Sequence, residues 1–147
     1  MDIVYNKNYN KKVDVTVGGL STEQVDGKLK DGRLASHLLE LLLEVWFPEL
    51  TCVDQKGYDH IREGSDILYD QKSFTKGGLQ FAPSSMYGAK RSVDYDVAHA
   101  HANSIDYIAT DITEFPKVVV RFVKGSDLVK DHPSCKVSYA KRDKLFA

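Results

Sequence analysis

Apolar residues at helical spacing predict two helices in the first third of the chain. Ser21, followed three residues later by Gln24, is a helix-start signature and predicts a short helix that runs to about Lys30. Residues 31–50 carry the strongest helical pattern, which Asp31 is suited to cap. The apolar face of this helix is expected to consist of Leu34, Leu38, Leu41, Leu42, Val45 and Trp46.

The remainder of the chain is predicted to form mainly strands and loops. Val13, Val15 and Val17 alternate with polar residues, which predicts a short strand near the N-terminus, and residues 66–74 alternate in the same way. The other expected elements are strand pieces at 51–53 and 58–61 around a turn at 54–57, a loop at 76–91, a helix at 92–105 capped by Ser92, and strands at 106–110 and 117–123. This order predicts a single domain of mixed α/β (α+β) type over residues 1–147.

Composition is that of an ordinary globular protein. With 42% hydrophobic and 28% charged residues, the chain has enough apolar material for one core. No run of about 18 apolar residues occurs, so no membrane span is expected. Cys52 and Cys135 lie far apart and match no zinc-site spacing, which indicates reduced thiols in a cytoplasmic protein.

Charge is distributed unevenly along the chain, although the formal net charge is −1. Such a net charge does not by itself indicate nucleic-acid binding. However, no acid occurs between Asp70 and Asp94, a window that contains Lys72, Lys76, Lys90 and Arg91. The acids that precede this window are Asp54, Asp59, Glu63, Asp66 and Asp70. The pattern suits a metal site beside a track for phosphates, with a solvated surface as the alternative.

Three residues have the chemistry that phosphodiester hydrolysis requires. Asp59 and Asp70 are eleven residues apart on two predicted strands, a spacing that suits a hairpin with both carboxylates at one end. Lys72 shares a strand face with Asp70, because side chains alternate along a strand. Two carboxylates can hold a divalent cation, and a nearby lysine can orient or activate the attacking water.

The preceding helix supplies candidates for a further metal ligand. His37, Glu40 and Glu44 share one stripe of this otherwise apolar helix, so the stripe must face water or a polar site. Either Glu40 or Glu44 is suited to bind the metal directly or through water, and the sequence does not choose between them.

The order of a Glu-bearing helix, an Asp, and then Asp70-Gln71-Lys72 resembles the PD-(D/E)xK nuclease superfamily over about residues 31–123. The resemblance implies a restriction-endonuclease-like core, a central mixed sheet flanked by helices, with residues 1–30 and 124–147 as flanking segments. It also implies Mg²⁺-dependent cleavage of double-stranded DNA, with Mn²⁺ as a substitute, and homodimers. Asp59 and Asp70 would bind the metal, Lys72 would be the catalytic lysine, and Glu44 or Glu40 the helix acid.

Other interpretations of these residues remain. The main alternative function is a non-catalytic DNA-binding or assembly protein that retains the nuclease fold. A simpler alternative places Asp70 and Lys72 on a solvated strand face. Ile67, Leu68 and Tyr69 argue against it, because they predict a strand that is buried on both sides, where unpaired charges are costly.

The loop at 76–91 is the best candidate for DNA contact. Its glycines permit close backbone approach, and its polar and cationic side chains suit phosphates or bases. The expected DNA-binding residues are Lys76, Gln80, Ser84, Ser85, Tyr87, Lys90 and Arg91. His99 and His101 point about 200° apart on a helix, so they are expected to share no metal and are kept as possible DNA contacts.

A homodimer is the expected assembly, because one subunit offers one active site and cutting both DNA strands needs two. The C-terminal tail at 124–147 is polar and ends in a basic segment. Tyr139, Leu145 and Phe146 are its candidate interface residues.

Overall fold

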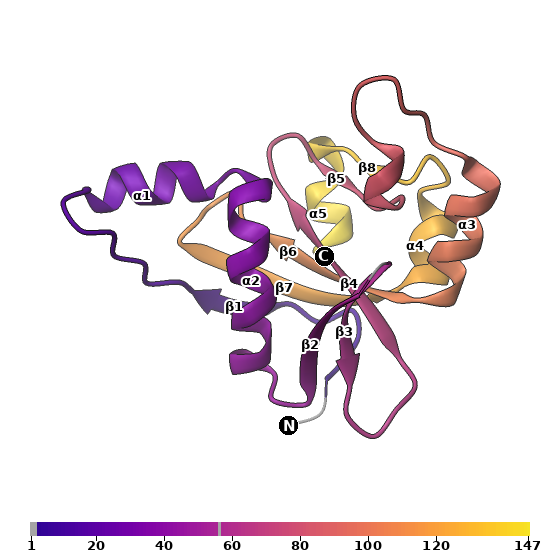
Figure 1. Ribbon diagram of the computed structural model, residues 1–147, viewed down its shortest axis with the longest axis horizontal. Helices are drawn as coiled ribbons and strands as arrows, with labels where there is room; N and C mark the ends of the chain where they lie inside the picture. Colours follow the sequence, from indigo (N-terminus) through magenta and orange to yellow (C-terminus); the bar gives the residue numbers. More distant parts are fainter. Residues whose placement is uncertain (1–2, 56) are drawn as a thin grey trace.

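One mixed sheet of six strands forms the centre of the protein (Figure 1). The computed structural model describes residues 3–55 and 57–147, without the side chains of Asp54 and Gln55. The strand order is β1-β7-β6-β4-β3-β2, and neighbours are antiparallel except for the parallel pair β4 and β6. The strands are β1 (Tyr9–Lys12), β2 (Leu50–Gln55), β3 (Tyr58–Arg62), β4 (Leu68–Phe74), β6 (Asp106–Asp111) and β7 (Lys117–Lys124).

Helices flank this sheet, and a second, two-stranded sheet pairs β5 (Leu79–Gln80) with β8 (Lys136–Val137). The helices are α1 (Thr22–Leu29), α2 (Gly32–Trp46), α3 (Tyr95–Ser104), α4 (Gly125–Asp131) and α5 (Arg142–Leu145), with short 3₁₀ turns η1 (Ser84–Met86) and η2 (Tyr139–Lys141). The predicted mixed α/β class is therefore confirmed. In the described part of the chain, no helix has both the length and the apolar character to cross a membrane.

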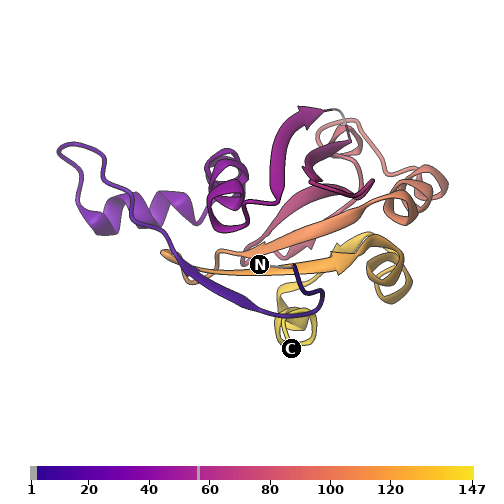
Figure 2. The same cartoon turned by 90° about the horizontal axis from the view of Figure 1, so that it is seen from below.

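Two hydrophobic cores lie on opposite faces of the sheet. The first core packs α1 and α2 against the sheet through Leu39, Leu43 and Phe122, among others. The second core lies under α3, α4 and the C-terminal segment and includes Phe74 and Tyr107. Figure 2 shows the sheet curling, so that β2 and β3 rise away from the plane of β7. The curl leaves α2 and α3 on either side of β4 (Figure 1).

The expected apolar face of α2 is correct only in part, since Leu38, Leu42 and Trp46 do pack against the first core. Ala35, Leu39 and Leu43 are fully buried against the sheet, whereas Leu34, Leu41 and Val45 are 56%, 59% and 71% exposed. Because this helix is apolar around most of its circumference, helical spacing alone does not select the side that meets the sheet. The capping of α1 by Ser21 and Gln24 and the Asp31 cap of α2 are confirmed.

Several expected boundaries are wrong. The N-terminal strand is Tyr9–Lys12 rather than 13–17, and its pairing ends one residue later, where the Val13 N–H donates to the Pro116 carbonyl oxygen at 2.9 Å. Asp94, not Ser92, caps α3 by accepting the Val97 N–H at 3.3 Å. The turn expected at 54–57 lies partly outside the described residues. The strands β6 and β7 agree with the expected ones at 106–110 and 117–123.

The C-terminal segment is part of the fold rather than a polar tail. Its residues form α4, β8 and α5, and Val129, Cys135 and Val137 are buried in the second core. Leu145 is also buried, and the Phe146 ring packs edge-on against Phe74. The expectation that Leu145 and Phe146 form an exposed interface is therefore wrong.

Close packing of α3 against α4 gives a first prediction. A Cβ at Gly125 would lie 1.9 Å from the Ala102 carbonyl oxygen and 2.1 Å from that of Ile105, both of them backbone atoms. Gly125→Ala should therefore lower the free energy of unfolding by about 3 kcal/mol or more. Gly27→Ala in α1 is the matched control, since nothing lies within 4 Å of a Cβ there. The control should be neutral or stabilising by up to about 1 kcal/mol in urea denaturation.

Candidate active site

The β3–β4 hairpin brings Asp59 and Asp70 together. The two strands are antiparallel with His60 opposite Tyr69, so continuing the register by one residue places Asp59 opposite Asp70. His60 and Tyr69 are fully buried, and Tyr69 belongs to the first core, so their neighbours Asp59 and Asp70 point to the other face. Asp59 Oδ2 accepts a hydrogen bond from the Gln71 N–H at 2.9 Å, which fixes its carboxylate beside β4.

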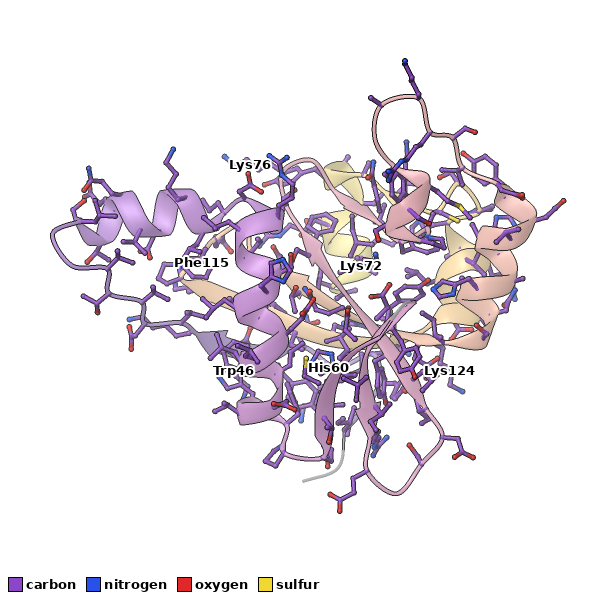
Figure 3. The ribbon with its side chains drawn as sticks, in the orientation of Figure 1. Trp46, His60, Lys72, Lys76, Phe115 and Lys124 are labelled. Carbon is purple, nitrogen blue, oxygen red and sulfur yellow. The ribbon has the colours of Figure 1, made fainter. Side chains whose placement is uncertain are left out.

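Lys72 completes this cluster from the same face of β4. Its Nζ lies 3.3 Å from Asp70 Oδ2, and the Lys72 and Asp70 side chains are 17% and 13% exposed. In Figure 3, Lys72 lies between α2 and α3. An ion pair of this burial is costly to desolvate and adds little net stability, so its position beside a second carboxylate favours a chemical role.

Electrostatics in the cluster disfavour two ionised carboxylates. Burial, followed by the hydrogen-bonding contact with Asp59, raises the pKa of Asp70 to about 8, although the Lys72 charge opposes the shift. Two carboxylates at opposing positions of paired strands repel each other when both are charged. A cation between them would remove that repulsion.

The structure distinguishes Glu40 from Glu44, which the sequence did not. Glu40 lines the same hollows in the surface as Asp59, Asp70 and Lys72. Glu44 lies one turn further along α2, and its Oε1 accepts the Cys52 N–H at 2.5 Å. Glu44 thus anchors the start of β2 to α2 and lies outside the site.

A groove between α2 and the η1–α3 segment contains the cluster. It consists of two adjoining hollows of about 560 and 730 Å³. The two share Glu40, Asp59, Asp70, Lys72 and Ser84. The first hollow extends toward the N-terminus of α2, and the second toward Arg91 and His101. The groove is open to solvent.

The chemistry of this donor set fits a hard divalent cation. Within residues 3–55 and 57–147, no three His, Cys, Asp or Glu side chains are gathered as a metal-ligand group. Mg²⁺, however, is commonly held by one or two carboxylates and keeps several of its waters. Asp59 and Asp70 meet that need, and Glu40 faces the same space.

The predicted DNA-binding residues fall into three groups. Gln80, Ser84, Ser85 and Arg91 line the groove. Lys76 is exposed beside a smaller hollow that adjoins it, and Lys90 is exposed outside the lining of both groove hollows. Tyr87 packs against the second core, and its hydroxyl accepts the Ala82 N–H at 3.2 Å, so it is not placed to read a base.

The two histidines of α3 lie on different sides, as helical geometry predicts. His99 Nε2 contacts the Pro133 carbonyl oxygen at 2.6 Å, away from the groove. His101 lines the groove, and its buried Nε2 has no hydrogen-bond partner among the residues that the structure describes. Burial and the nearby Lys72 charge lower the pKa of His101, which favours the neutral imidazole.

The acids that precede β4 do not form one cluster. Glu63 and Asp66 are exposed in the turn of the hairpin, at the end opposite Asp59 and Asp70. The side chain of Asp54 lies outside the described residues. Of the described acids in this segment, Asp59 and Asp70 line the groove.

No family model, no curated protein and no solved structure matches the chain. The function of the protein must therefore be inferred from the chemistry of the groove.

Proposed function

We propose that the protein is a Mg²⁺-dependent DNA endonuclease of the PD-(D/E)xK type. The observation that carries the proposal is the pair of carboxylates, Asp59 and Asp70, next to Lys72 in an open groove. These are the groups that phosphodiester hydrolysis needs: ligands for a cation that neutralises developing charge, and a positive side chain at the scissile phosphate.

The order of elements supports a restriction-endonuclease-like core. A helix that carries Glu40 precedes a hairpin that carries Asp59 and the Asp70-Gln71-Lys72 strand. A crossover containing α3 then leads to β6, which pairs parallel to β4. The resemblance to the superfamily rests on the first part of this order, a Glu-bearing helix followed by Asp59 and Asp70-Gln71-Lys72.

In the proposed mechanism, each residue has a defined task. Asp59 and Asp70 would hold Mg²⁺, with Mn²⁺ as a substitute, and Glu40 would contribute to the site from α2 directly or through water. When bound, the ion would supply charge neutralisation at the phosphate and activation of the attacking water. Lys72 donates a hydrogen bond to the attacking water or to a phosphate oxygen, and its pairing with Asp70 holds the ammonium at this position. Ser84 and Arg91 offer donors to the neighbouring phosphates.

The two glutamates of α2 provide a prediction that separates metal binding from structure. Glu40→Gln should weaken the stabilisation of the protein by Mg²⁺ or Mn²⁺ several-fold, because it removes a carboxylate charge from the groove beside Asp59 and Asp70. Glu44→Gln should leave that response intact and lower stability by about 1 kcal/mol, because it weakens the bond to the Cys52 N–H. Thermal melts over a metal titration measure both effects. A metal response that is lost in Glu44→Gln and kept in Glu40→Gln would show that Glu44, not Glu40, contributes to metal binding.

A homodimer remains part of the proposal, because one groove cuts one strand. Leu34, Leu41 and Val45 form an exposed apolar stripe on α2, beside the groove. They replace the buried Leu145 as candidate contacts between subunits. Sedimentation of the wild type and of Leu41→Glu tests whether the subunits associate through this stripe. The wild type should sediment as a dimer and the variant as a monomer.

Nicking of supercoiled plasmid tests the function directly. The protein, with Mg²⁺ or Mn²⁺ and without either, is incubated with supercoiled, linear and branched DNA. Metal-dependent nicking is the expected result. Binding of DNA without cleavage of any substrate in either metal would instead favour the alternative, a non-catalytic DNA-binding or assembly protein.

A further inference from the structure

We infer that the groove continues into a phosphate-binding surface formed by Lys30, Arg33 and Lys76, which holds the backbone of the nucleic-acid strand beyond the cut. This surface is called the basic end below. The inference rests on the proposed function for the identity of the strand, and it assigns binding to Lys30 and Arg33, which no sequence motif connected to the site.

The basic end is assembled by the approach of two segments far apart in sequence. Gly32 begins α2, and a Cβ there would lie 3.4 Å from both Ser73 Cβ and Thr75 Cγ2 at the end of β4. This contact brings Lys30 and Arg33 next to the β4–β5 turn that carries Lys76. In Figure 3, Lys76 lies close to one end of α2, well away from Lys72.

The basic end is continuous with the groove. Lys30 and Lys76 line a hollow of about 270 Å³ together with Thr75, Gly77 and Thr113. Thr75 and Gly77 also line the first hollow of the groove, as does Arg33. A strand whose phosphate lies at Lys72 can therefore extend along this side without leaving the surface.

The charge at this surface is suited to phosphates. Among the described residues, no ion pair involves Lys30 or Lys76, and Arg33 has an exposed contact of 3.5 Å with Asp31. Asp111 and Glu114, which flank Thr113 in the chain, are both engaged by Arg142, at 2.6 and 3.0 Å. This single guanidinium offsets part of their negative charge, and the lining residues of the smaller hollow include no acid. Exposed cations of this kind bind nucleic acid through its backbone, independently of sequence.

Salt-dependent binding tests the inference. The double variant Lys30→Ala/Lys76→Ala is compared with Lys124→Ala/Lys130→Ala, which removes the same charge from exposed positions on β7 and α4. Fluorescence anisotropy of a labelled DNA in EDTA measures affinity from low to moderate salt. We expect Lys30→Ala/Lys76→Ala to bind DNA about tenfold more weakly than the wild type. The slope of the log binding constant against log salt concentration should become shallower by about 1.5–2. The affinity of the control variant should change by less than about twofold.

The outcomes test DNA binding by the basic end separately from DNA cleavage by the protein. The inference is wrong if both double variants lose the same affinity for DNA, or if Lys30→Ala/Lys76→Ala loses none. It is also wrong if the protein binds polyglutamate more tightly than DNA. Wild-type DNA binding that depends on Lys30 and Lys76, without any cleavage in Mg²⁺, would sustain the basic end and refute the nuclease. If cleavage occurs, the first variant should raise KM and leave kcat within about twofold, since its residues lie away from Lys72.

Discussion

Replacement of Lys72 by alanine is expected to reduce DNA nicking by about 10²–10³-fold, a loss typical of removing a group that stabilises charge at the reacting centre. Lys72 is the cation next to Asp70, with 3.3 Å between Nζ and Oδ2, and it lies at the centre of the groove. Without it, the attacking water and the scissile phosphate lose their positive partner. The carboxylates remain, so Mg²⁺ should still bind.

Single-turnover cleavage at saturating enzyme measures this loss without interference from substrate binding. Lys72→Met serves as a second variant that preserves the aliphatic stem, and Lys124→Ala is the control for a general loss of positive charge. A melting temperature that still rises with Mg²⁺ would show that the Lys72 variants retain the metal site. Nicking by Lys72→Ala at a rate close to that of the wild type would remove Lys72 from the mechanism.

Replacement of Asp70 by asparagine is expected to stabilise the metal-free protein. The folded-state pKa of Asp70 is raised to about 8 by burial and by Asp59, whereas the unfolded chain releases this proton near pH 4. The folded state thus holds the proton more tightly, and the wild type loses stability as the pH rises from about 4 to 8. Asparagine carries no charge, so the variant should gain about 2 kcal/mol or more over the wild type above pH 8 and little below pH 4.

Mg²⁺ should reverse this ranking. Metal binding requires ionised carboxylates, so its stabilisation of the wild type should grow with pH and be lost in Asp70→Asn, together with nicking. Urea denaturation at pH 4, 6 and 8.5, with EDTA and with Mg²⁺, measures both effects. If the wild type is more stable than Asp70→Asn in EDTA at pH 8.5, the pKa of Asp70 is not raised in the folded protein.

Local features were predictable from the sequence. The Ser21–Gln24 capping box, the Asp31 cap and the strands β6 and β7 follow from short-range patterns. The hairpin that joins Asp59 to Asp70 was also predictable, because the spacing of the two acids and the alternation along β4 already place both side chains at one end. Each of these features depends on residues close together in the chain.

Features that depend on distant segments were missed. The burial of Ala35, Leu39 and Leu43 depends on how α2 docks on the sheet in the first core. The same docking turns Glu40 toward the groove and Glu44 toward the Cys52 N–H. The burial of Leu145 required the second core, to which the C-terminal segment contributes one side.

The sequence by itself determined the chemical groups of the site: two carboxylates and a lysine on paired strands, with the lysine two residues from the second acid. The tertiary structure decided which glutamate joins them, that Tyr87 is not placed to read a base, and that Lys30 and Arg33 lie beside Lys76. The physical reason is that alternation and capping act over a few residues, whereas a groove is formed where separate elements pack. Burial, pKa and charge at the groove are properties of that packing.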